Sequence, residues 1–208
     1  MSSTINSVVV AMASLVLSGG SAALAQGKPE AAKPEAAKPE AGKPEAGKPT
    51  GPPPIPKEMD QLKVFLGNWK CTGEAAGPEP GKTHKSTSEN VIKADMGGFW
   101  LSVKHHEPKS KDNPMEFTAQ GWWGYDATTK QFVGLFAGSH GVWEARSSKG
   151  WVGDTWVWAG VLHAFMGNVE TQFRHTFTKK TDKEIAEKFE ARLNDKWTTL
   201  GENTCKKQ

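Results

Sequence analysis

Two runs of alternating apolar and polar residues meet across a short polar turn in the middle of the chain. Five apolar side chains share one face of the first run: Met115, Phe117, Ala119, Trp123 and Tyr125. One face of the second run carries Gln131, Val133, Leu135 and Ala137. A period of two is that of a half-buried strand, and Asp126 and Thr129 suit the turn. The pattern predicts an antiparallel hairpin with Trp123 and Tyr125 facing the protein interior and Trp122 facing out.

Similar alternation recurs along the rest of the chain from residue 68. It predicts strands at 68–76, 84–95, 98–107, 115–126, 130–138, 141–147, 150–159, 168–178, 184–193 and 196–206. Short connections rich in turn-forming residues separate them. Before them, Met59, Leu62 and Phe65 or Leu66 recur at helical spacing. We therefore expect an all-β domain of about ten antiparallel strands, an up-and-down barrel opened by a short helix, with a two-sheet sandwich as the alternative.

The hairpin formed by 168–178 and 184–193 has its apolar residues at odd positions on both strands. Matching odd with odd predicts a register that pairs Phe173 with Phe189 and His175 with Glu187. His175 and Glu187 are the only ionisable side chains on this apolar face. They are interpreted as an interior pair that fixes the register, as a polar anchor for a ligand, or as a general acid/base dyad. Phe173 and Phe189 are candidate wall residues beside them.

The first quarter of the chain differs in composition from the rest. Residues 1–25 carry no charge, contain an apolar run from Val8 to Leu17, and end in Ala-Leu-Ala before Gln26. These features are typical of a secretory signal peptide and predict a secreted or periplasmic protein. Residues 26–56 repeat Lys-Pro-Glu every five residues and then become proline-rich. Such a segment is expected to be a disordered tether, which leaves 57–208 as the barrel domain.

Charge and segment length exclude two classes of partner. Lys and Arg total 26 against 23 for Asp and Glu. Because this balance is nearly even and the basic residues are dispersed, we expect no nucleic-acid partner. The apolar run from Val8 to Leu17 is too short to cross a bilayer, so we expect no integral membrane span.

Metal and catalytic motifs are not apparent in the sequence. The six histidines are scattered, and the adjacent His105 and His106 point to opposite faces of a strand. No spacing typical of zinc ligands occurs, and no nucleophile elbow or phosphate-binding glycine loop is present. We therefore expect no metal and assign no catalytic residue. The nine tryptophans fit core and outer-face packing, an aromatic cavity for an apolar or planar small molecule, or a platform for a carbohydrate or a membrane surface.

Four motifs carry a family resemblance. They are Phe-Leu-Gly-Asn-Trp-Lys at 65–70, Gly-Gly-Phe-Trp-Leu at 97–101, Trp-Gly-Tyr-Asp at 123–126 with Lys130 and Phe132, and Trp-x-Gly-Asp-Thr at 151–155. In these the chain resembles the bacterial family called domain of unknown function 1579, whose members are similar to lipocalin-like (calycin) barrels. The resemblance implies a closed barrel with Trp69 across its closed end and the first and last strands side by side. It implies no activity.

Two further expectations follow from this resemblance. Cys71 and Cys205 lie near the two ends of the folded domain, which in an exported protein suggests a disulfide. Adjacent first and last strands would bring the two cysteines together. The related nitrobindin-like barrels hold haem through a histidine near the end of the chain, and the last strand here has none, so we expect no haem.

The sequence therefore predicts an exported barrel that binds a small apolar or planar molecule in its lumen without catalysis. Two alternatives remain open. One is an acid/base enzyme that uses His175 and Glu187 in the lumen. The other is a structural protein of the cell envelope whose tether sets its distance from a partner.

Overall fold

A computed structural model of the protein describes residues 51–77, 82–164 and 169–208. The predicted signal peptide at 1–25 lies outside the described residues, as does the predicted tether at 26–56 except for its last six positions. Both remain predictions.

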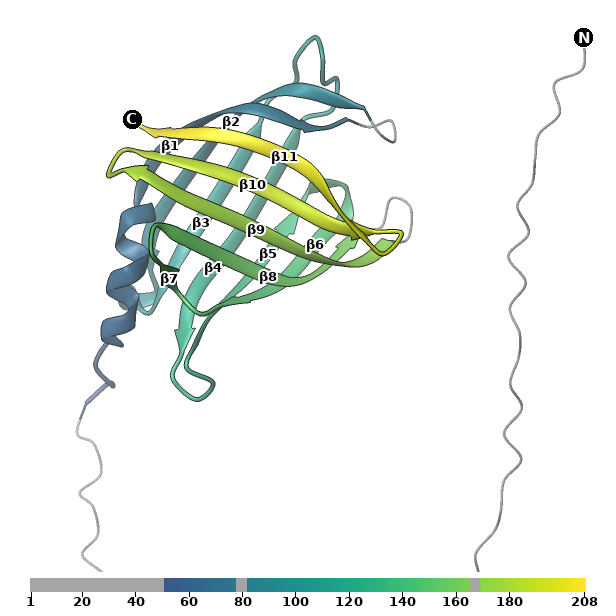
Figure 1. The fold of residues 1–208 in the computed structure, drawn as a ribbon. Coiled ribbons are helices and arrows are strands. Elements are labelled where there is room, and N and C mark those ends of the chain that lie inside the picture. The colour runs from purple at the N-terminus through teal and green to yellow at the C-terminus, as the bar shows by residue number, and fades with distance from the viewer. Residues whose placement is uncertain (1–50, 78–81, 165–168) are drawn as a thin grey trace, which may run out of the picture. The chain divides into compact units, whose positions relative to one another are not determined.

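The described residues form one closed antiparallel barrel (Figure 1). Its strands are β1 (Gly67–Ala76), β2 (Thr83–Asp95), β3 (Trp100–Glu107), β4 (Phe117–Asp126), β5 (Gln131–Gly138), β6 (Val142–Ser148), β7 (Trp151–Val152), β8 (Thr155–Ala164), β9 (Val169–Thr181), β10 (Glu184–Leu193) and β11 (Lys196–Lys207). Consecutive strands pair in order, except that β6 pairs with β8 and the short β7 extends from the edge of β8. Pairing of β1 with β11 completes the circle. The predicted ten-stranded up-and-down barrel is confirmed, and the sandwich is excluded.

One predicted strand, 150–159, is two strands in the structure. The chain turns at Gly153, whose φ of +59° is a left-handed conformation that glycine adopts without strain. The turn separates β7 from β8, and β8 continues to Ala164. The prediction failed because aromatic residues on both sides of Gly153 continue an apolar run through the turn.

The predicted register between β9 and β10 is wrong by two residues. Glu187 is directly opposite Phe177, and His175 is directly opposite Phe189. An irregularity between Glu184 and Ile185 shifts the strands at the hairpin end. A shift of two keeps odd positions facing odd positions, so every side chain stays on its predicted face. His175 and Glu187 therefore remain neighbours, although they are diagonal rather than opposite.

A short helix closes one end of the barrel. Helix η1 (Lys57–Phe65) is a 3₁₀ helix, and its buried residues Met59, Leu62 and Phe65 recur every three positions, the period of that helix. The Phe65 ring is surrounded by aromatic rings, with centroids 5.3 to 5.7 Å from those of Phe177, Trp123, Trp151 and Trp156. The indole nitrogen of Trp69 donates a 2.7 Å hydrogen bond to the Phe65 carbonyl. We define the aromatic plug as Phe65 together with the rings of Trp123, Trp151, Trp156 and Phe177. This plug seals the end of the barrel next to η1.

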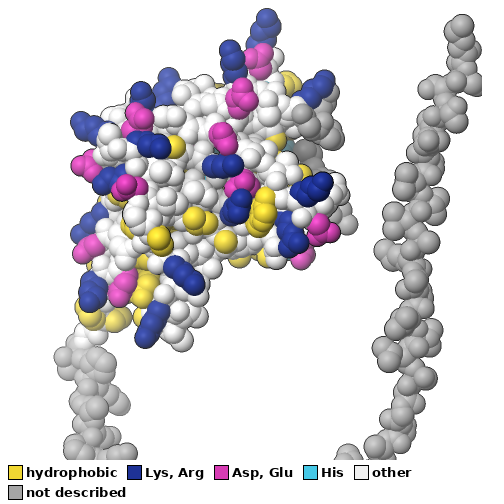
Figure 2. Space-filling model, in the orientation of Figure 1, with side chains coloured by type: hydrophobic (Ala, Val, Ile, Leu, Met, Phe, Trp, Pro, Cys, Tyr) yellow, Lys and Arg dark blue, Asp and Glu magenta, His cyan; other side chains and the backbone are white. Residues whose placement is uncertain are grey.

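The outer wall carries charges of both signs. Figure 2 shows basic and acidic side chains interspersed over the face in view, with hydrophobic side chains gathered toward its lower part. On β5, the inward residues are Phe132 and Phe136, whereas Leu135 lies on the outer wall and is 48% exposed. Trp122, directly opposite Leu135, also faces out and donates to Asp95 across 3.2 Å. Within the described residues, no helix is both long and apolar enough to cross a bilayer.

Candidate functional site

A cavity of about 560 Å³ occupies the barrel lumen. At one end it reaches Phe65 and Trp123 of the aromatic plug. At the other end its lining includes Gly77 and His140, which lie where strands end away from η1. The cavity is thus a cup, sealed at the η1 end, whose wall is formed by the inward side chains of the strands.

The structure places four of the six predicted ligand-binding residues in this lining. His175, Glu187, Phe189 and Trp123 border the cavity. Phe173 is buried beside Phe189 and points inward, but it is not part of the lining. Tyr125 lies on the inward face of β4 near the η1 end, where it packs against Phe132 outside the cavity.

His175 and Glu187 form an ion pair in the lumen wall. Nε2 of His175 lies 2.5 Å from Oε1 of Glu187, although the ring N–H does not point along this contact as a hydrogen bond requires. Burial alone would raise the pKa of Glu187, but the contact with His175 and the neighbouring His105 and Arg146 side chains outweigh it and hold that pKa below its ordinary value. Glu187 is therefore an ionised carboxylate inside the barrel.

We predict that Glu187 contributes stability that is lost in acid. Its pKa is lowered in the folded protein, so the folded state binds this proton less readily than the unfolded chain. The stability that Glu187 contributes is fully present above the pKa that this carboxyl has in the unfolded chain. It disappears as the pH falls through the lower pKa that the carboxyl has in the folded protein. Glu187→Gln should lower the free energy of unfolding by about 3 kcal/mol near neutral pH. The difference from wild type should shrink below about pH 4.3.

Urea denaturation from about pH 3 to pH 7 measures this difference. The control is Glu202→Gln on the same sheet, because the Glu202 side chain is 62% exposed and its ion pair with Lys188 is a surface contact. A Glu187→Gln difference that is constant across the pH range would contradict the assignment.

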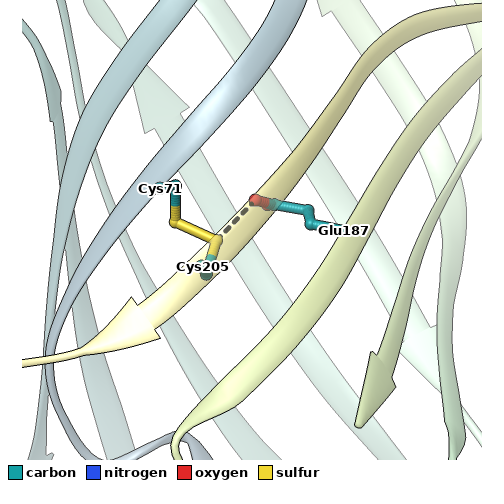
Figure 3. A group of neighbouring side chains, drawn as sticks. All are labelled: Cys71, Glu187 and Cys205. Carbon is teal, nitrogen blue, oxygen red and sulfur yellow. Dashed lines mark hydrogen bonds between the residues drawn. A yellow bond between two sulfur atoms is a disulfide. The ribbon is translucent and has the colours of Figure 1, made fainter. Parts of the chain in front are cut away.

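The disulfide lies beside this ion pair. Cys71 on β1 and Cys205 on β11 are directly paired, and their sulfur atoms are bonded in the structure. Figure 3 shows the Glu187 side chain reaching from β10 toward Cys205. Oε2 of Glu187 lies 3.2 Å from Sγ of Cys205. A disulfide sulfur has no proton to donate, so this contact is a close approach of oxygen and sulfur.

The same three side chains have the spacing of a metal site, but the disulfide prevents them from forming one. Their candidate ligand atoms lie within 4.8 Å of one another. Metal-binding cysteines act as thiolates, and both sulfurs here are bonded to each other. No other group of three such side chains in the described part of the chain meets this spacing.

A buried arginine lies deeper in the lumen, at a position that the sequence analysis missed. The Arg146 side chain is 2% exposed, and Nη1 is 3.0 Å from Oε1 of Glu144. Its guanidinium carbon is 5.1 to 5.4 Å from the ring centroids of Phe136, Trp123 and Trp158. Burial lowers the pKa of Arg146, and the neighbouring Glu144 and Glu187 charges oppose that shift.

Space for the Arg146 side chain comes from its cross-strand neighbours. Both residues directly opposite it, Gly134 on β5 and Gly160 on β8, are glycines. A Cβ on Gly134 would lie 3.3 Å from Cγ of Arg146. The alternation on β6 is the reverse of the usual one, because Glu144 and Arg146 point inward while Trp143 points outward. This reversal would be visible in the sequence only once the pairing with β5 is known.

A second carboxylate–histidine pair lies nearer the end opposite the aromatic plug. Nε2 of His84 on β2 is 2.8 Å from Oε1 of Glu107 on β3, and both residues are buried. Neither residue was singled out by the sequence analysis, since the pair is separated by 23 positions in the chain. Alternation alone does place His84 on the inward face of β2, beside Ser86 and Ser88.

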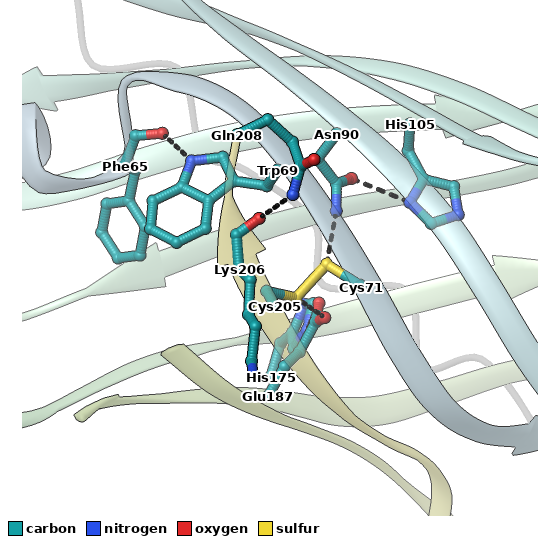
Figure 4. Close-up of a disulfide and its surroundings, with 10 residues drawn as sticks. All are labelled: Phe65, Trp69, Cys71, Asn90, His105, His175, Glu187, Cys205, Lys206 and Gln208. Atoms are coloured by element: carbon teal, nitrogen blue, oxygen red, sulfur yellow. Dashed lines mark hydrogen bonds and ion pairs between the residues drawn. A yellow bond between two sulfur atoms is a disulfide. The ribbon is translucent and has the colours of Figure 1, made fainter. Parts of the chain in front are cut away.

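A chain of hydrogen bonds joins the disulfide to a third inward histidine. Nδ2 of Asn90 lies 3.2 Å from Sγ of Cys71, and Oδ1 of Asn90 lies 2.9 Å from Nδ1 of His105. Figure 4 shows this row, with Glu187 and His175 on the Cys205 side of the disulfide. Burial lowers the pKa of His105, partly opposed by the charges of Glu187 and Glu107. The outward neighbour His106 instead pairs with Glu116 at the surface.

Comparisons with known proteins identify the family and the fold. The family described as "Protein of unknown function (DUF1579)" matches residues 56–206. The crystal structure of Rv2717c from M. tuberculosis aligns with a TM-score of 0.58 and 12% identity, covering 74% of this chain and 99% of that one. A redesigned β-barrel aligns with a TM-score of 0.36 and 14% identity over 71% and 95% of the two chains. No curated protein sequence matches the chain. At 12% identity the Rv2717c structure supports the fold alone.

Proposed function

Because the chain belongs to the DUF1579 family of proteins of unknown function, we propose a role from the lumen itself: the barrel binds a small molecule there without chemical turnover. The observation that supports this proposal most strongly is the cup-shaped cavity of about 560 Å³ in the lumen. Ligand sites in proteins are commonly concave spaces of about 300 to 1,000 Å³ with mostly apolar walls and a few placed polar groups.

The composition of the wall supports a binder. The cavity is lined by aromatic side chains such as Phe117, Phe136 and Phe189 together with paired polar groups. If the barrel interior served only as a packed core, side chains would fill this volume, because protein interiors are normally packed to the density of organic crystals. The cavity therefore suits a molecule with a mainly apolar body.

The ionic contacts favour binding over catalysis. A general base acts in catalysis only beside a nucleophile or a substrate proton. His175 and His84 are each held against a carboxylate and His105 is held by the Asn90 amide, and these contacts orient the rings without supplying a nucleophile. The lumenal serines Ser86 and Ser88 have no hydrogen bond to a histidine among the described residues. No arrangement of nucleophile, base and orienting group is therefore assembled in this part of the chain.

We place the protein outside the reducing cytoplasm. Residues 1–25 have the features of a secretory signal peptide, and the Cys71–Cys205 disulfide is a feature that persists in oxidising compartments. Secreted or periplasmic location is thus supported by two independent features. Mass spectrometry of the N-terminal peptide of the mature protein tests it, with Gln26 as the expected first residue.

A substitution that fills the cavity tests the binding role. Ser86 is buried and lines the lumen, whereas the adjacent Thr87 faces solvent. We predict that Ser86→Phe weakens binding of the fluorescent probe N-phenyl-1-naphthylamine at least about tenfold, because the ring occupies lumen volume. Thr87→Phe, the matched control, should bind like wild type. Quenching of the lumenal tryptophans, together with the gain in probe fluorescence, reports the binding.

Thermal unfolding of both variants confirms that they are folded. Equal probe affinity in Ser86→Phe and Thr87→Phe would show that the probe binds outside the lumen and would remove the support for this role.

A further inference from the structure

We propose that the lumenal ligand is an uncharged amphiphile that donates a hydrogen bond, from a hydroxyl or N–H group, to Nε2 of His105. The inference rests on the proposed binding function and specifies its ligand. Three observations carry it: the pairing of charges in the lumen, the contacts that fix the His105 tautomer, and the free position of Nε2.

The lumen has no spare fixed charge to recognise an ion. Its acidic lining residues within the described chain are Glu107, Glu144 and Glu187. Each has a basic partner within 3.0 Å, in His84, Arg146 and His175 respectively. No lysine or aspartate joins the described lining. A charged ligand would therefore find no unpartnered counter-charge among these acidic and basic side chains, and burying an unpaired charge is strongly unfavourable.

The disulfide determines which way the Asn90 amide faces. The contact with Cys71 favours a hydrogen-bond donor at this position of Asn90, because a disulfide sulfur can accept a hydrogen bond weakly but has no proton to give. That atom is Nδ2, at 3.2 Å. The carbonyl oxygen Oδ1 is then left to face His105, as the structure has it.

The Asn90 carbonyl in turn fixes the tautomer of His105. Oδ1 can only accept, so Nδ1 of His105, 2.9 Å away, carries the proton. A neutral imidazole has one N–H and one lone pair, which leaves the lone pair on Nε2. Burial lowers the pKa of His105 and so favours this neutral form. The covalent bond between Cys71 and Cys205 thus presents His105 as an acceptor.

Nε2 of His105 has no hydrogen-bond partner among the described residues, although the ring lines the cavity. The charged or titratable groups that act on it are Glu187, Glu107, His175 and His106. The neighbouring wall is aromatic, with the Phe117 ring centroid 5.7 Å from that of His105. A ligand with an apolar ring beside Phe117 and a hydroxyl directed at Nε2 would pack against the aromatic wall and donate a hydrogen bond to His105.

Three naphthalene probes test this assignment at about pH 7: 2-naphthol, which is uncharged and has a donor; 2-methoxynaphthalene, which lacks the donor; and 2-naphthoate, which is an anion. In wild type we expect 2-naphthol to bind about tenfold more tightly than 2-methoxynaphthalene, and 2-naphthoate to bind most weakly. His105→Leu should remove the preference for naphthol over its methyl ether. His106→Leu, one position away on the outer face, should retain it.

The tautomer has its own spectroscopic test. In ¹⁵N NMR of the histidine side chains, Nδ1 of His105 should have the shift of a protonated ring nitrogen and Nε2 that of an unprotonated one. Asn90→Leu should bring the two shifts closer as both tautomers become populated. A wild-type spectrum with Nε2 protonated overturns the inference without recourse to any variant.

The outcomes separate the two levels of the proposal. If 2-naphthol and 2-methoxynaphthalene bind the wild type equally well, or 2-naphthoate binds best, the ligand assignment is wrong and the binding function stands. If none of the three probes binds the wild type, while the protein is folded, both are overturned.

Discussion

Replacing Cys71 and Cys205 with serine is expected to lower the free energy of unfolding by about 5 kcal/mol in the chain-entropy description. The disulfide joins residues separated by 134 positions. Without it the unfolded chain gains the conformations that the closed loop forbids. The bond also joins β1 to β11, the first and last strands of the barrel, whose pairing closes it.

Urea denaturation of the Cys71→Ser, Cys205→Ser double variant measures this loss. The matched control is the Thr72→Ser, Thr204→Ser double variant, because these residues form the next pair along the same two strands. Their side chains lie on the opposite face from the disulfide. The control should remain within about 0.5 kcal/mol of wild type. A loss below about 1 kcal/mol in the cysteine variant would mean that the unfolded chain is already restricted without the bond.

The second large effect is expected at the aromatic plug. Phe65→Ala should lower the free energy of unfolding by about 3 to 5 kcal/mol. The Phe65 side chain is 2% exposed and contacts four aromatic rings from β4, β7, β8 and β9. Its removal leaves a void under η1 that these rings cannot fill without losing their contacts with one another.

The control for this change is Lys63→Ala on the same helix. The Lys63 side chain is 69% exposed and forms a surface ion pair with Asp60, so its loss should cost less than about 0.5 kcal/mol. The two variants are compared by thermal and urea denaturation. If Phe65→Ala unfolds no more easily than Lys63→Ala, η1 is not an integral part of the barrel closure.

The strands and their order could be predicted from the sequence because the evidence for them is local. Alternation in residues such as Phe117 to Tyr125 has the period of a strand, and Asp126 with Thr129 supplies the turn. The faces of β9 and β10 were also predicted, since a period of two fixes which residues share a side. The sliding of one strand along the other is not fixed by that period, which is why the register was wrong by two.

The lumenal polar groups were harder to predict because their partners are distant in sequence. Only His175 and Glu187 lie on one predicted hairpin. His84 meets Glu107 across β2 and β3, and Asn90 contacts both Cys71 and His105 on different strands. On β6, Glu144 and Arg146 point inward against the usual rule that charged side chains face water. Their burial depends on cross-strand glycines, which alternation within one strand does not indicate.

The central claim, that the lumen holds a small molecule, is tested most directly by native mass spectrometry of the protein purified from its natural host. The account predicts a noncovalent adduct of one small, uncharged molecule on the wild type. Denaturation should release it, and Ser86→Phe prepared in the same way should lack it. A wild type with no adduct, or the same adduct on Ser86→Phe, would contradict lumenal binding.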